Sequence, residues 1–165
     1  MFGTLLEIIG IALNPIGFVL EIVKDSVVPR NGAVVYCKLG PFEHTGIYIK
    51  NYRQILHLNR HGYIELVPPE EFAFHFGGTI YVSCHQSESI ESSGAANRAL
   101  ARYESDSWKK YDIVSNNCHE FTVGCITGIR ENNAFTFFML EIEIRFATMH
   151  NNWRSWTIED GNYLH

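Results

Sequence analysis

The sequence predicts a single α+β domain in which an antiparallel sheet packs against a helix that begins at Cys118. A series of short apolar segments, separated by links short enough for hairpins, predicts the sheet. The tripeptide 115–117, Ser-Asn-Asn, consists of favoured N-cap residues and places Cys118 in the first turn of the helix. At 165 residues, 46% of them hydrophobic, the chain is long enough to bury one sizeable core and short for two.

Turn signals separate the strands of the predicted sheet. The turn 29–32, Pro-Arg-Asn-Gly, precedes the first strand, and the links 40–43 and 51–53 join the next strands as hairpins. The predicted strands are residues 33–39, 45–50, 54–59, 63–67 and 78–84.

Three helices are predicted after this sheet. Residues 95–104 are rich in the strong helix formers alanine, leucine and arginine. The helix that begins at Cys118 extends to Thr127 and stops at Gly128, because glycine is a favoured C-cap residue. In residues 135–149 the large apolar side chains fit both a helical spacing and a strand alternation, and we favour the helix.

Residues 1–28 form a segment separate from the catalytic domain predicted for residues 29–165. Their apolar run predicts two short amphipathic helices joined at Asn14-Pro15. Early basic residues are absent and Pro15 interrupts the run, which fits neither a signal peptide nor a membrane span of about 20 apolar residues. We expect the segment to pack on the core or on a second copy, with peripheral membrane contact as the alternative.

Charge and cysteine content indicate which cellular compartment and which classes of partner to expect. The formal charge of −5 is spread along the chain without a basic cluster, so no nucleic-acid partner is expected. A chain this rich in core-forming residues has no need of disulfides, so its four cysteines are expected to be free thiols in a reducing, cytoplasmic setting.

Cys118 is the candidate nucleophile. In the first turn of a helix, unpaired backbone N–H groups and the helix dipole stabilise a thiolate. The alternative is that Cys118 is a small buried apolar residue, which is the common fate of free cysteine. We assign that structural reading to Cys37, Cys84 and Cys125, because nothing in the sequence near them offers activation.

Two histidines are candidates for the base. His44 opens a predicted strand and shares one face of it with Gly46 and Tyr48. His57 lies between two leucines on the next strand. If these strands pair as a hairpin, one imidazole is placed to orient the other.

Other catalytic chemistries lack their sequence signals. The sequence holds no CxxC pair, no HExxH and no HxH, so we expect no metal and no other cofactor. His119 and Glu120 are adjacent on a helix and therefore point in different directions. The GxSxG motif of serine hydrolases is also absent.

Three motifs resemble those of a known family. EHTGIYI, ILHL and NNCHEF, in that order, resemble the lecithin:retinol acyltransferase-like family of the NlpC/P60 superfamily, which are circularly permuted papain-like thiol enzymes. The resemblance covers roughly residues 32–128. It implies that Cys118 attacks an acyl ester, that His44 is its base and that His57 orients His44.

Two positions depart from the family pattern. Ala33 stands where the family often has an acidic residue, and His119 precedes Glu120 where the family usually has the reverse order. Neither departure affects the implied triad.

The predicted function is a thiol acyltransferase or hydrolase that acts on an ester or amide carbonyl through a thioester acyl-enzyme. A lipid or another acyl-bearing small molecule is the expected substrate, and Tyr48 and Asn117 are candidates to line its cleft. Two alternatives stay open. One is a permuted papain-like isopeptidase of the deubiquitinase or deSUMOylase type, which lacks the second histidine, and the other is a non-catalytic binding module on the same fold.

Overall fold

The computed structural model describes residues 22–23, 26–73, 78–110 and 117–156. Its strands are β1 (Ile22–Val23), β2 (Val34–Leu39), β3 (Phe42–Ile49), β4 (Gln54–Leu58), β5 (Ile64–Val67), β6 (Ile80–His85), β7 (Glu88–Ser89) and β8 (Asn152–Trp156). Its helices are α2 (Pro69–Ala73), α3 (Ser93–Asp106), α4 (Cys118–Thr127) and α5 (Phe137–Thr148).

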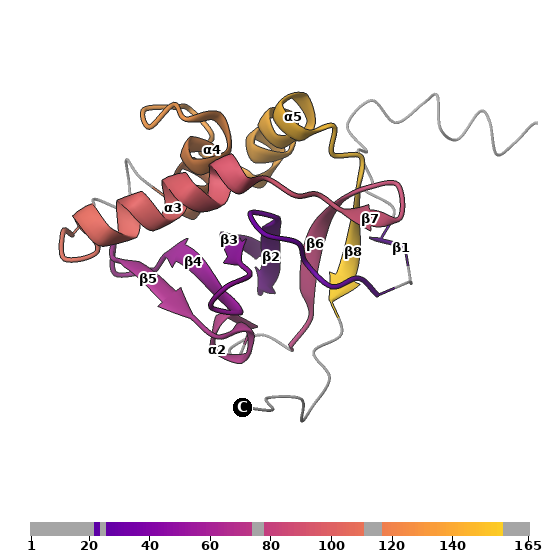
Figure 1. Ribbon diagram of the computed structural model, residues 1–165, viewed down its shortest axis with the longest axis horizontal. Coiled ribbons are helices and arrows are strands. Elements are labelled where there is room, and N and C mark those ends of the chain that lie inside the picture. Colours follow the sequence, from indigo (N-terminus) through magenta and orange to yellow (C-terminus); the bar gives the residue numbers. More distant parts are fainter. Residues whose placement is uncertain (1–21, 24–25, 74–77, 111–116, 157–165) are drawn as a thin grey trace, which may run out of the picture.

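One sheet in the order β1-β8-β6-β2-β3-β4-β5 organises the fold, with β7 paired to β6. All its pairs are antiparallel except β1 with β8, which is parallel. The helices α3, α4 and α5 lie on one side of the sheet and the short α2 lies on the other (Figure 1). The predicted α+β class, with an antiparallel sheet packed against helices, is confirmed.

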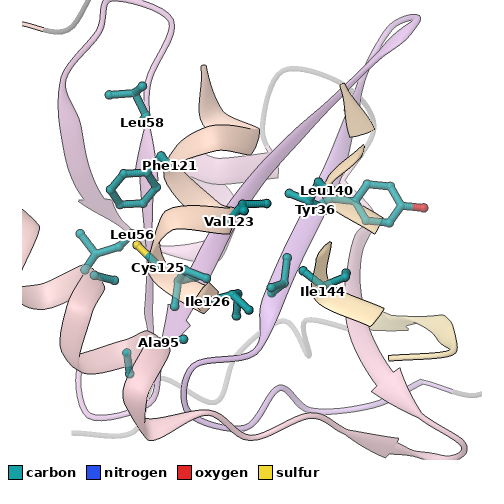
Figure 2. Close-up of a cluster of buried hydrophobic side chains, with 14 of the residues drawn as sticks. Tyr36, Leu56, Leu58, Ala95, Phe121, Val123, Cys125, Ile126, Leu140 and Ile144 are labelled. Carbon is teal, nitrogen blue, oxygen red and sulfur yellow. The ribbon is translucent and has the colours of Figure 1, made fainter. Parts of the chain in front are cut away.

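The alternation of side chains along the strands builds a core on each face of the sheet. Val34 and Tyr36 of β2 join the larger cluster beneath α3, α4 and α5, where Phe121 of α4 is buried (Figure 2). Val35 and Cys37 point the other way and pack in the cluster that includes Phe72 of α2. Successive strand residues face opposite sides, so the same short segments supply both clusters.

Local signals define the ends of α4. Asn117 and Glu120 form a capping box at its N-terminus, in which each side chain binds the other residue's backbone. Gly128 ends the helix with φ of 82°, a left-handed conformation that glycine adopts without a steric penalty. These signals fix Cys118 as the first residue of the helix, as predicted.

Most predicted elements are confirmed. The five predicted strands correspond to β2 to β6, although β3 begins at Phe42, earlier than expected. The helix predicted for 95–104 lies within α3, and the helical reading of 135–149 corresponds to α5.

The prediction of a second amphipathic helix near the end of segment 1–28 is wrong where the structure describes it. Ile22 and Val23 form β1, and Val27 continues the contact by donating its N–H to the carbonyl of Ser155 at 2.9 Å. The physical reason is that β8 offers unpaired backbone groups at the sheet edge, and the β-branched pair satisfies some of them. Residues 1–21 and 24–25 lie outside the described part of the chain.

Candidate active site

Gly46 lies just beyond the end of the β3–β4 ladder, and β4 packs directly against its Cα atom. The ladder pairs only Ile47–Ile49 with Gln54–Leu56. A Cβ atom on Gly46 would lie 2.7 Å from Ile55 Cγ2 and 2.8 Å from the Leu56 carbonyl oxygen, closer than real contacts allow. It would also lie 3.2 Å from the Cβ of His57. The missing side chain therefore leaves the space in which the neighbouring histidines meet.

We expect Gly46→Ala to destabilise the fold by about 1–3 kcal/mol, because the added methyl group must displace backbone rather than a flexible side chain. Urea unfolding measures this change. Gly94→Ala is the matched control, because its methyl group would meet only side-chain atoms of Arg98, at 3.2 Å or more, and no backbone. Equal stability of the two variants would contradict the close packing of β4 against Gly46.

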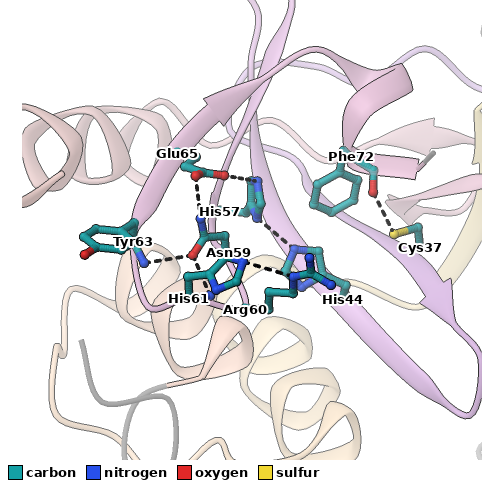
Figure 3. A network of polar contacts seen from close by, with 9 residues as sticks. All are labelled: Cys37, His44, His57, Asn59, Arg60, His61, Tyr63, Glu65 and Phe72. Atoms are coloured by element: carbon teal, nitrogen blue, oxygen red, sulfur yellow. Dashed lines mark hydrogen bonds and ion pairs between the residues drawn. The ribbon is translucent and has the colours of Figure 1, made fainter. Parts of the chain in front are cut away.

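His44 and His57 are in direct contact (Figure 3). His44 Nε2 lies 2.8 Å from His57 Nδ1, and the rings meet edge to face at 89°. Both rings also pack on Phe72, with centroid distances of 5.1 and 5.4 Å. Burial lowers the pKa of both histidines, and the neighbouring His57 and then His119 lower that of His44 further. Both imidazoles are therefore neutral near pH 7.

This contact restricts the tautomers that suit a base. If His44 Nδ1 is to accept a proton, the ring hydrogen must sit on Nε2 and be donated to His57 Nδ1. The hydrogen of His57 then lies on Nε2, which is 3.9 Å from Glu65 Oε2 and has no hydrogen-bond partner among the described residues. The carboxylate of Glu65 favours that tautomer electrostatically.

Glu65 is itself held in place. It lies opposite His57 in the β4–β5 ladder, and its carboxylate accepts a hydrogen bond from the Asn59 side-chain amide. Asn59 in turn accepts from the backbone N–H groups of His61 and Tyr63, each at 2.9 Å (Figure 3). Glu65 was not predicted as a site residue, and the signal that identifies it is its cross-strand register with His57.

Cys118 lies at the start of α4 against Thr45, the residue after His44. Burial raises the pKa of the Cys118 thiol, and four hydrogen-bond donors oppose that rise. These donors are the backbone N–H and the hydroxyl of Thr45, and the N–H groups of Cys118 and His119. The helix N-terminus therefore favours a thiolate as predicted, but desolvation prevails in the free protein.

The other three cysteines are buried, whereas Cys118 is partly exposed. Burial raises the pKa of Cys37 to about 12, and the pKa values of Cys84 and Cys125 to about 11. Cys37 also donates its thiol hydrogen to the Phe72 carbonyl at 3.3 Å. These environments agree with the structural reading of all three.

The structure brings His44 to His57, and Cys118 to the residue next to His44. Cys37 marks this proximity, because it is the ladder partner of His44 and its pKa is also raised by the charge of Cys118. Within the described residues no hydrogen bond joins Cys118 Sγ to His44, whose Nδ1 is the nitrogen left for the thiol. Productive transfer requires that remaining gap to close, which is common for catalytic contacts in unliganded sites.

A second side chain near the thiol, His119, was not among the predicted site residues. His119 Nδ1 lies 3.9 Å from Cys118 Sγ and 3.2 Å from Thr45 Oγ1. Thr122 donates to Thr45 Oγ1 at 3.2 Å. Burial lowers the pKa of His119 to about 4, so it is also neutral near pH 7. The unusual order of His119 and Glu120 was the only sequence signal that pointed to it.

The two predicted cleft residues have structural partners. Tyr48 is 5% exposed and packs edge to face on Trp156. Asn117 accepts from the N–H groups of His119 and Glu120, and its side-chain amide donates to the Phe135 carbonyl at 2.9 Å. Their contact with substrate stays a prediction, whereas the capping by Asn117 clearly positions Cys118.

Two structural features are absent from the described residues. They hold no group of three or more histidine, cysteine, aspartate or glutamate side chains placed to bind a metal ion. No helix among them is both long and apolar enough to cross a membrane.

Comparisons with known proteins add no relative: no family model, no curated protein and no solved structure matches the chain significantly.

Proposed function

We propose that the protein is a cysteine-dependent acyltransferase or hydrolase with Cys118 as nucleophile, His44 as base and His57 as the residue that orients the base. We further propose that its α+β fold is the circularly permuted papain-like fold of the NlpC/P60 superfamily. The observations that carry the proposal are the 2.8 Å contact between His44 Nε2 and His57 Nδ1, and the partly exposed Cys118 thiol at a helix N-terminus against Thr45, the residue after His44. A structural pair of buried histidines would not require a partly exposed thiol against the residue that follows one of them in the chain.

In the proposed reaction, Cys118 gives its proton to His44 Nδ1 as the sulfur attacks the carbonyl carbon of the substrate. The N–H group of Cys118 at the helix start would stabilise the oxyanion. His44 then returns the proton to the leaving alcohol or amine, which leaves an acyl thioester on Cys118. Water or an amine attacks this thioester while His44 accepts its proton. The acyl–sulfur bond then breaks, the acid or amide is released, and His44 returns the proton to the sulfur to restore the thiol.

Thr45 and His119 would stabilise the thiolate during this cycle. Both side chains lie near the Cys118 sulfur. Thr122 donates its hydroxyl hydrogen to Thr45 Oγ1, so the hydroxyl hydrogen of Thr45 is free to point at the sulfur. His119 would then hold its hydrogen on Nδ1, facing the same atom. His119 is thus a positioning residue for the thiolate rather than a second base, because its Nδ1 is also in contact with Thr45 Oγ1.

Substitution of the thiol tests the proposal. We expect Cys118→Ala to lower turnover at least about 1,000-fold without unfolding, because no other described thiol is accessible. The substrates to compare are a phospholipid, an activated fatty-acid ester and a ubiquitin isopeptide. Circular dichroism melting reports the fold.

Cys125→Ala is the matched control, because Cys125 lies on the same helix but is buried in the core. Turnover of the isopeptide alone would favour the isopeptidase alternative. Turnover that survives Cys118→Ala, or a parent protein inactive on all three substrates, would overturn the proposal.

A further inference from the structure

Helix α5 presents an unusually apolar outer face. We define the α5 apolar face by its exposed large side chains and those that flank it: Phe135, Phe138, Met139, Ile142, Phe146 and Met149. Phe146 is 84% exposed and Phe138 is 53% exposed. Within α5, all of which the structure describes, Glu143 is the only exposed charged residue. Contiguous exposed apolar surface of this kind marks an interaction site more often than scattered single residues do.

The α5 apolar face adjoins the candidate active site. The carbonyl of Phe135 accepts the hydrogen bond from Asn117, the residue that caps α4. The ring of Phe137, at the start of α5, lies 6.0 Å from that of His119. Helices α4 and α5 pack side by side above the sheet (Figure 1). A ligand that covers the first turns of α5 is therefore next to the turn that carries Cys118.

The size of the face argues against a second copy of the chain as its partner. A helix of 12 residues is about 18 Å long and about 10 Å wide, so one face covers on the order of 200 Å². A stable protein interface buries about 800 Å² on each partner. A lipid surface needs no such matching area, because an amphipathic helix binds it by inserting one apolar face into the headgroup and acyl boundary.

Charge selects the kind of lipid surface. Basic side chains attract anionic lipids, but the one basic residue of this helix, Arg145, is only partly exposed, Glu143 is exposed, and the whole chain carries a formal charge of −5. A zwitterionic surface, which requires no electrostatic attraction, fits this helix better.

We propose that the protein binds zwitterionic lipid surfaces through the α5 apolar face, next to Cys118. Lipid binding does not depend on catalysis, but its role in bringing an acyl ester to the Cys118 thiol rests on the proposed function. This surface differs from residues 1–28, the segment for which the sequence predicts peripheral membrane contact.

Cosedimentation of the full-length protein with phosphatidylcholine vesicles tests the proposal. The variant combines Phe138→Glu in the first turn with Phe146→Lys in the last turn, so net charge is unchanged and each charge suits the helix dipole. Removing two inserted phenyl groups should weaken binding roughly 100-fold, because each contributes about a factor of ten or more. The matched control, Tyr52→Glu with Trp108→Lys, replaces two exposed aromatic residues away from α5 and should bind as the parent does.

Three outcomes would overturn the proposal. The first is that the parent protein does not bind the vesicles, and the second is that the parent and the α5 variant bind equally. The third is that the parent is a dimer and the α5 variant is a monomer. Hydrolysis of a water-soluble acyl ester, measured in parallel, separates this proposal from the proposed function. Vesicle binding without ester turnover would retain the surface and reject the enzyme, whereas turnover without vesicle binding would do the reverse.

Discussion

His44→Ala is expected to lower turnover about 1,000-fold or more, and His57→Ala is expected to lower it less, by about 10- to 100-fold. The order follows from the geometry. In the proposed reaction His44 exchanges a proton with Cys118, whereas His57 fixes the tautomer of His44 through the 2.8 Å contact. His57→Gln should retain more activity than His57→Ala, because it keeps a polar group of similar reach. Steady-state kinetics across pH measures the series.

A purely structural histidine would behave differently. Loss of orientation should reduce kcat and alter its pH profile, whereas loss of packing should mainly reduce thermal stability. Exposed His61 provides the control, since His61→Ala should match the parent. If His57→Ala matches the parent in kcat and pH profile, His57 is structural and the isopeptidase alternative becomes the better reading.

Acid is expected to destabilise the protein steeply between about pH 6.5 and pH 4. Burial lowers the pKa of His57 and His119 to about 4 and that of His150 to about 3. The unfolded chain binds protons at these histidines below its ordinary pKa of about 6.5, whereas the folded chain stays neutral. Stability is therefore complete above about pH 6.5 and falls as pH drops towards the folded values.

The expected slope is large. Each buried histidine contributes up to about 1.4 kcal/mol per pH unit, so three contribute up to about 4 kcal/mol per unit, and His44 acts in the same direction. Glu141 offsets part of this loss, because burial raises the pKa of its carboxyl group. Domains of this kind have total stabilities of about 5–15 kcal/mol, so unfolding near pH 5 is expected.

Urea unfolding at pH 7.5, 6.5 and 5.5 measures the slope. His119→Asn should reduce it by about 1.4 kcal/mol per pH unit, because one buried titrating group is removed. His61→Asn, at an exposed site, should leave it unchanged. A stability that stays constant from pH 7.5 to 5.5 would contradict the burial of these imidazoles.

The sequence predicted the sheet around the site well, because β2 to β5 follow one another with short links and alternating side chains. It missed β8, whose residues Asn-Trp-Arg-Ser-Trp mix polar and large side chains without a turn signal. It also missed β1, because that strand pairs in parallel with β8, far away in the chain. Such nonlocal pairing leaves no periodic signal in either segment.

Some residues of the candidate site were likewise predictable from local sequence, and others were not. Cys118, His44 and His57 were found because a capping sequence and strand positions mark them locally. Glu65 and Thr45 were missed because their relevance depends on register and on how α4 lies against β3. His119 was dismissed because adjacent helix residues point apart, yet its ring still reaches within 3.9 Å of the Cys118 sulfur.

The acyl-enzyme provides the most direct test of the central claim. The protein is mixed with an activated fatty-acid ester, quenched in acid within seconds, and analysed by intact mass and peptide mapping. We expect one acyl group, held as a hydroxylamine-sensitive thioester on Cys118, absent from Cys118→Ala and slowed in His44→Ala. An acyl group on Cys37, Cys84 or Cys125, or equal acylation of Cys118→Ala, would contradict the assignment of Cys118 as the nucleophile.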